Sequence, residues 1–125
     1  MKRDLPSAVS PDLERVFRDL IQEESQQVIK ERRASHREPL VRPVTIVLKG
    51  EHGNGPPIEG FSKNCSPAGL GLVTSVKFDD RQIAVIEIHR LSKPSVRVLA
   101  ECRWTDTFGM GWFYSGWTFL SLARN

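Results

Sequence analysis

The sequence has few cysteines and lacks the long apolar runs and secretion signals that several protein classes need. Its only cysteines, Cys65 and Cys102, match no CxxC or zinc-ligand spacing. No apolar run approaches the roughly 18 to 20 residues that span a bilayer. The N-terminus begins with basic residues but has no apolar segment of a secretory signal. We therefore expect a cytoplasmic protein with reduced, partly buried thiols and without a metal or a membrane span.

Catalytic signatures are also missing. We find no Ser–His–Asp arrangement, no carboxylate pair in a plausible cleft and no GxxxxGK[ST] phosphate loop. The chain is therefore not expected to be an enzyme or to need a cofactor. What remains is the composition of an ordinary globular domain, with 39% hydrophobic and 26% charged residues in 125. That length fits one domain, with room for an added helix.

Positive charge is concentrated in one short window. The whole chain carries a net charge of +3, and the window from Lys30 to Arg42 has five basic and two acidic residues, which is also +3 (5 − 2). The remainder is therefore neutral overall. A protein that binds long polyanions more often spreads its charge along a face or groove. A local cluster is better suited to a compact anion.

An amphipathic helix is expected before this window. Ser10 suits an N-cap and Pro11 the first helical position. Apolar residues follow with helical spacing at Leu13, Val16, Phe17, Leu20, Ile21, Val28 and Ile29. Pro39 disfavours helix at the residue before it. We predict a disordered segment over 1–9, the helix over 10–31 and a β-domain over 32–125. The apolar stripe suits packing on that domain or on a second chain, including a homodimer.

Short runs rich in β-branched and aromatic residues fill the rest of the chain. They are "VRPVTIVLKG", "IEGFSKN", "GLGLVTS", "QIAVIEIHRL", "SVRVLAECRW" and "WFYSGWTFL". Segments with turn chemistry, such as "GEHGNGPP", "SPAG" and "TDTFGMG", separate them. Strands at even spacing with no helix between them predict an all-β core, either an antiparallel barrel or a sandwich.

A second candidate for function is the stretch "NCSPAGLGL", which joins two of these predicted strands. Asn64 and Ser66 are two residues apart, so both side chains can point to one face of an extended segment. Pro67 favours a turn, and Gly69 permits a positive φ or a close approach of the backbone to a ligand. These are also the commonest hairpin residues, so this stretch alone is a weak signal.

The two stretches together resemble the PilZ-domain family. Arg33 and Arg37 form RxxxR, and Asn64, Ser66 and Gly69 form NxSxxG, roughly thirty residues later. The family signature is RxxxR followed by [D/N]xSxxG, and the ending "SGWTF" is similar to its closing strand. The resemblance implies a six-stranded antiparallel β-barrel that binds the bacterial second messenger cyclic di-GMP. It also implies that these five residues contact the ligand.

Two further residues enter through the same resemblance. An arginine at position 32 is similar to family variants that bind two stacked, intercalated messenger molecules, so Arg32 predicts two ligands per protomer. Its alternative is a solvated residue in the last helical turn, favoured by the helix dipole. Trp104 matches a position where some members place an aromatic against a guanine, although strand aromatics more often belong to a core. Asn64 stands where Asp is commoner, which removes charge assistance toward the guanine donors.

The chemistry of arginine fits such a ligand. A guanidinium pairs bidentately with phosphate or with guanine O6 and N7, and it also stacks on a purine. We therefore expect a stand-alone receptor that changes conformation on binding and signals to a partner protein. Two alternatives stay open: a PilZ-like protein-interaction module without nucleotide binding, and a small barrel that binds single-stranded nucleic acid.

Overall fold

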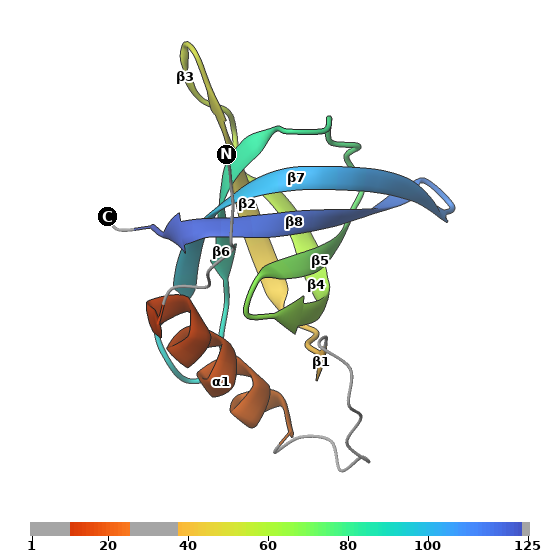
Figure 1. Cartoon of the computed structure of the whole chain (residues 1–125). Helices are drawn as coiled ribbons and strands as arrows, with labels where there is room; N and C mark the ends of the chain where they lie inside the picture. Colours follow the sequence, from red (N-terminus) through yellow and green to blue (C-terminus); the bar gives the residue numbers. More distant parts are fainter. Residues whose placement is uncertain (1–10, 26–37, 124–125) are drawn as a thin grey trace.

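A closed antiparallel barrel forms most of the molecule. The structure is a computed structural model that describes residues 11–25 and 38–123. It has a helix followed by eight strands: α1 (Pro11–Ser25), β1 (Glu38–Pro39), β2 (Pro43–Gly50), β3 (Gly53–Asn54), β4 (Ile58–Ser66), β5 (Gly69–Thr74), β6 (Ile83–Ile88), β7 (Val96–Gly109) and β8 (Trp112–Leu122). The sheet order is β1-β4-β5-β8-β7-β6-β2-β3, and an additional β4–β2 pairing closes it (Figure 1). The six-stranded antiparallel barrel with an N-terminal helix is therefore confirmed.

Some predictions lie outside the described residues. These are the disordered segment over 1–9, the end of the predicted helix beyond Ser25, and the three arginines Arg32, Arg33 and Arg37. The described part of the helix begins at Pro11, the residue expected in its first turn. In the part of the chain that the structure describes, no helix is long and apolar enough to cross a membrane.

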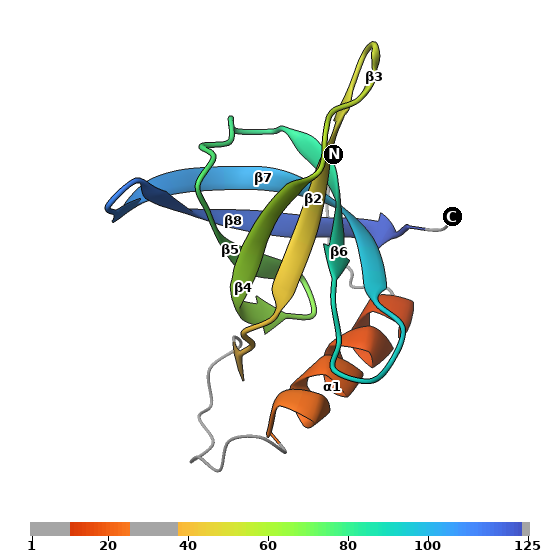
Figure 2. The same ribbon diagram turned by 180° about the vertical axis from the view of Figure 1, so that it is seen from behind.

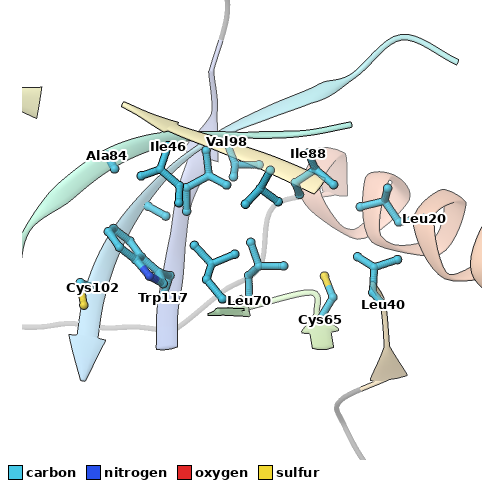
Figure 3. Packing of buried hydrophobic residues seen from close by; sticks show 14 of the residues in the cluster. Leu20, Leu40, Ile46, Cys65, Leu70, Ala84, Ile88, Val98, Cys102 and Trp117 are labelled. Carbon is cyan, nitrogen blue, oxygen red and sulfur yellow. The ribbon is translucent and has the colours of Figure 1, made fainter. Parts of the chain in front are cut away.

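The barrel core is apolar and includes one side of the helix. Trp117 is its largest side chain, 2% exposed, with its ring edge-on to Phe78 at a centroid distance of 5.2 Å. The Trp117 indole nitrogen donates a hydrogen bond to Ser115 Oγ at 2.8 Å, so burial leaves this N–H paired. Figure 3 shows most of the cluster, and the whole cluster contains Leu13, Leu20, Leu40, Val44, Ile46, Cys65, Leu70, Leu72, Phe78, Ala84, Ile86, Ile88, Val98, Ala100, Cys102 and Trp117.

The helix packs on the barrel of its own chain. Leu13 and Leu20 are buried in the core cluster, and Val16 and Phe17 pack against it. Leu20 lies next to Leu40, which directly follows β1 (Figure 3). In Figures 1 and 2 the helix lies at one end of the barrel, beside the loop between β6 and β7. The described part of the apolar stripe therefore packs within the chain, and a homodimer through the helix stays a prediction.

The hairpin of β7 and β8 reaches beyond the barrel. The segment "TDTFGMG" was expected to be a turn, and this is wrong for its first five residues, because β7 continues to Gly109. Only Met110 and Gly111 lie between the paired residues Gly109 and Trp112. The chemistry of this segment favours a turn, but cross-strand pairing with β8 holds it extended. The exposed tip carries Phe108, Met110 and Trp112.

Replacing Met110 by asparagine should stabilise this hairpin. Met110 has φ 55° and Gly111 has φ 85°, as in a type I′ turn, and the Met110 side chain is 97% exposed. Asparagine tolerates the left-handed conformation better than methionine does. We expect Met110→Asn to add about 1 kcal/mol to the unfolding free energy and to raise the thermal midpoint by roughly 4 °C. Met110→Leu keeps the conformational cost and is the control. A midpoint for Met110→Asn no higher than that of Met110→Leu would contradict the prediction.

Candidate functional site

The candidate ligand residues of the described chain lie on three strands, β4, β5 and β7. Cys65 is fully buried in the core, and its neighbours on β4 point to the opposite face, where Asn64 is partly exposed but Ser66 is buried at 8% exposure. A bulge between Ser62 and Asn64 sets this alternation. Trp104, 40% exposed, is on the outer face of β7. The predicted run "SVRVLAECRW" stops at Trp104, and this end is wrong, because β7 continues to Gly109.

Register across the sheet brings Asn64 and Trp104 into one row. Asn64 on β4 pairs with Gly71 on β5, Gly71 pairs with Gly116 on β8, and Gly116 pairs with Trp104 on β7. The two residues between Asn64 and Trp104 are therefore both glycines. Since strands in a sheet are about 4.8 Å apart, the row spans roughly 14 Å. A ligand lying across these strands meets a polar amide at one end of the row and an indole at the other.

The glycines let side chains from the neighbouring strands lie close to the sheet. A Cβ on Gly116 would lie 2.4 to 2.6 Å from three atoms of the Trp104 indole. A Cβ on Gly71 would lie 2.7 Å from Asn64 Oδ1 and 2.9 Å from Tyr114 Oη. Both distances are shorter than real Cβ contacts, so any other residue would push these groups away from the sheet. The positions of Asn64, Tyr114 and Trp104 on this face therefore require glycine at positions 71 and 116.

Ser66 and Gly69 have structural roles of their own at the β4–β5 turn. Ser66 is 8% exposed, and its Oγ accepts a hydrogen bond from the backbone N–H of Ala68 at 3.2 Å. Gly69 does not have a positive φ, because the positive-φ glycines of the described chain are Gly53, Gly109 and Gly111. A Cβ on Gly69 would lie 2.2 Å from the carbonyl oxygen of Trp117. The close backbone approach at Gly69 is therefore to β8, and its contact with a ligand stays a prediction.

The short strand β1 joins the two motifs of the sequence. Glu38 pairs with Cys65 and Pro39 pairs with Asn64, both antiparallel. Arg37 directly precedes Glu38, and consecutive Cα atoms are 3.8 Å apart. The RxxxR motif therefore ends one residue before a strand that pairs with the NxSxxG motif. The contacts of Arg32, Arg33 and Arg37 lie outside the described residues.

Charge on this face is uneven. Lys63 holds its ammonium 5.9 Å from the centroid of the Tyr114 ring, next to Asn64. At the other end, β7 carries Asp106, which pairs with Tyr114, whereas the charge of Glu101 is balanced by Arg103 at 3.7 Å. The β4 side is therefore the more positive side of the face, and the arginine motif adjoins β4 through β1. Negative groups of a ligand would be better accommodated there than over β7.

The Cys102 thiol has a shifted pKa. Burial raises the pKa of the Cys102 thiol, an effect opposed by its hydrogen bonds to Thr105 and to the Trp104 carbonyl. Cys102 therefore stays a neutral thiol near pH 7 and is a poor nucleophile. Within residues 11–25 and 38–123, no group of three or more His, Cys, Asp or Glu residues could hold a metal ion.

Tyr114 was not predicted from the sequence, although it is central to this face. Its ring contacts those of Trp104 and Phe108, and its hydroxyl accepts a hydrogen bond from Asn64. The alternation of Trp112, Tyr114 and Gly116 on β8 was the available signal, since it places all three on one face. Which of them would meet Asn64 depends on cross-strand register, which the local sequence does not contain.

Comparison with known proteins decides the family. The family model described as the PilZ domain matches residues 31–124, which includes both arginines of RxxxR and the whole barrel. The chain belongs to the PilZ family. Members of this family are cyclic di-GMP receptors and are typically not enzymes. The comparison with curated proteins gives no match, so the assignment depends on the family model and on the motifs within it.

Proposed function

We propose that this PilZ protein is a stand-alone receptor for cyclic di-GMP. The observation that supports it most is the pairing of β1 with β4, since Glu38 and Pro39 lie against Cys65 and Asn64. This pairing brings the end of RxxxR to the strand that carries NxSxxG. Two motifs that are distant in sequence thus adjoin one outer face, where a small ligand can contact both.

Each predicted residue has a role that suits its chemistry. Arg33 and Arg37 pair with phosphate or with guanine O6 and N7, because a guanidinium offers two parallel donors. Asn64 and Ser66 offer amide and hydroxyl groups to the same ligand from β4. Trp104 offers an indole on which a guanine stacks, at the other end of the Asn64–Trp104 row. Gly69 shapes the turn that holds Ser66.

The proposed signalling route begins at β1, which directly follows the arginine motif. Leu40, fully buried, comes directly after β1 and contacts the same core cluster as Leu13 and Leu20 of the helix. A ligand that draws residues 32–37 onto the barrel would change the position of β1 and hence the support for α1. We propose that this shift alters a surface recognised by a downstream protein.

Calorimetric titration of the wild-type chain with cyclic di-GMP tests the proposal. We expect saturable binding with two ligands per protomer, because Arg32 precedes the RxxxR motif. No binding heat at micromolar protein, at two temperatures, would refute the receptor. A stoichiometry of one would refute only the role of Arg32. The titration is repeated with a linear guanine dinucleotide and at two salt concentrations. An extended site for single strands would show a steep salt dependence, whereas a compact site would show a shallow one.

A further inference from the structure

Tyr114 connects the two ends of the candidate row. It is the only tyrosine of the chain and is half-buried on the outer face of β8. Asn64 Nδ2 donates a hydrogen bond to Tyr114 Oη at 2.8 Å. The Trp104 ring lies edge-on to the Tyr114 ring, with centroids 5.1 Å apart and planes at 79°. One side chain thus contacts a predicted polar residue of β4 and a predicted stacking residue of β7.

The contact with Asn64 defines the direction of its amide. Without a partner, a terminal amide rotates about its last bond between two nearly equivalent arrangements. Here Nδ2 is directed to Tyr114 Oη, and Oδ1 lies above Gly71, 2.7 Å from where a Cβ would be. The absence of a side chain at Gly71 is what permits Asn64 and Tyr114 to meet. A ligand therefore encounters an amide in one fixed orientation.

The contact with Trp104 defines the position of the indole. Gly116 leaves room for the indole to lie close to the sheet, and the Tyr114 ring blocks its movement toward the hairpin tip. Phe108 lies on the far side of Tyr114, with centroids 6.1 Å apart, and Lys63 lies 5.9 Å from the Tyr114 centroid. These neighbours hold the Tyr114 ring in turn, so it is a rigid support for Trp104.

We propose that Tyr114 is a positioning residue of the cyclic di-GMP site, an inference that rests on the proposed function. Its hydroxyl orients Asn64, and its ring orients Trp104, before the ligand arrives. Orientation in advance removes the ordering that binding would otherwise have to impose, which is a recognised source of affinity. The hydroxyl acts through Asn64 and does not itself touch the nucleotide. This makes the role separable from that of a ligand-contacting residue.

A double-mutant cycle tests the hydroxyl. Tyr114→Phe removes Oη and keeps the ring against Trp104 and Phe108. We expect its affinity for cyclic di-GMP to fall about 3- to 10-fold, the size of one lost hydrogen bond. In an Asn64→Ala background the same change should have no further effect.

Tyr114→Leu, which also removes the support of Trp104, should weaken binding more than Tyr114→Phe. Ser121→Ala removes an exposed hydroxyl at the other end of β8 and is the matched control.

A second measurement separates positioning from stability. Unfolding free energies of all variants are measured alongside, and the Asn64 side-chain amide signal in NMR, assigned by its loss in Asn64→Ala, should move in ligand-free Tyr114→Phe. Unchanged affinity of Tyr114→Phe, or additive losses in the cycle, would overturn the positioning role while the receptor stands. Absence of binding by the wild-type chain would overturn the receptor and, with it, this inference.

Discussion

Gly69→Ala should destabilise the barrel by about 3 kcal/mol. The added Cβ would lie 2.2 Å from the Trp117 carbonyl oxygen and 3.6 Å from the Thr118 Cα. The first of these is far inside van der Waals contact, and the atom it meets is backbone. A flexible side chain could move aside, but the Trp117 carbonyl belongs to β8 at its pairing with β5. Relief of the clash therefore requires the two strands to separate, and urea-induced unfolding of the variant measures the cost.

Gly55→Ala is the control for this change. Its Cβ would have only ordinary contacts, 3.9 Å from Leu48 atoms, and Gly55 has no positive φ. We expect it to change stability by no more than about 0.5 kcal/mol. If Gly69→Ala were as stable as Gly55→Ala, the close approach of the β8 backbone to Gly69 would be disproved.

The same reasoning changes how Gly69 is interpreted in the motif. A loss of nucleotide binding in Gly69→Ala would first be a loss of fold, because this glycine is demanded by strand packing. Ser66 is similar, since its Oγ accepts the Ala68 N–H within the turn. Substitutions at these two positions test the fold and the ligand site together. Asn64 and Trp104 are partly exposed and are the better probes of the site alone.

The strands were largely predictable because their signals are local. In five of the six barrel strands, most of the observed ends lie within two residues of the predicted ends. The reason is that turn residues bound the β-branched runs. The exception was β7, whose last residues have turn chemistry and are held extended only by pairing with β8. Barrel closure through β2 and β4 depends on pairing between distant strands. Here it was implied by the family resemblance and not by any single segment.

The candidate site also has a part that local sequence predicts and a part that depends on cross-strand pairing. The common face of Asn64 and Ser66, opposite the apolar Cys65, follows from period-2 alternation, whereas the burial of Ser66 does not. The Asn64–Gly71–Gly116–Trp104 row does not follow, because a shift of one residue between any two strands would break it. Tyr114 was missed for that reason. Gly116 stands in the same strand as Tyr114, but the contacts with Asn64 and Trp104 depend on register with β4, β5 and β7, which that segment does not encode.

Arg37→Ala should lower the affinity for cyclic di-GMP about 10- to 100-fold. The proposed role of Arg37 is a bidentate, charge-assisted contact, and such a contact contributes about 1.5 to 3 kcal/mol, which corresponds to that range. Arg33→Ala should have an effect of the same size. Arg37→Lys should recover only part of the loss, since an ammonium supplies charge without the planar pair of donors. Calorimetric titration gives the affinities, and unfolding curves show whether each variant is folded.

Lys49→Ala is the matched control for charge. Lys49 is an exposed residue at the end of β2, in the hairpin with β3 that projects from the barrel, so its removal also lowers the net charge by one (Figures 1 and 2). If binding depended on the overall charge, Lys49→Ala and Arg37→Ala would weaken it equally, and raising the salt would abolish both losses. A local site predicts the opposite: wild-type affinity for Lys49→Ala, and a loss for Arg37→Ala that persists when exposed charges are screened. Arg37→Ala within twofold of wild type would show that the ligand does not use the RxxxR motif.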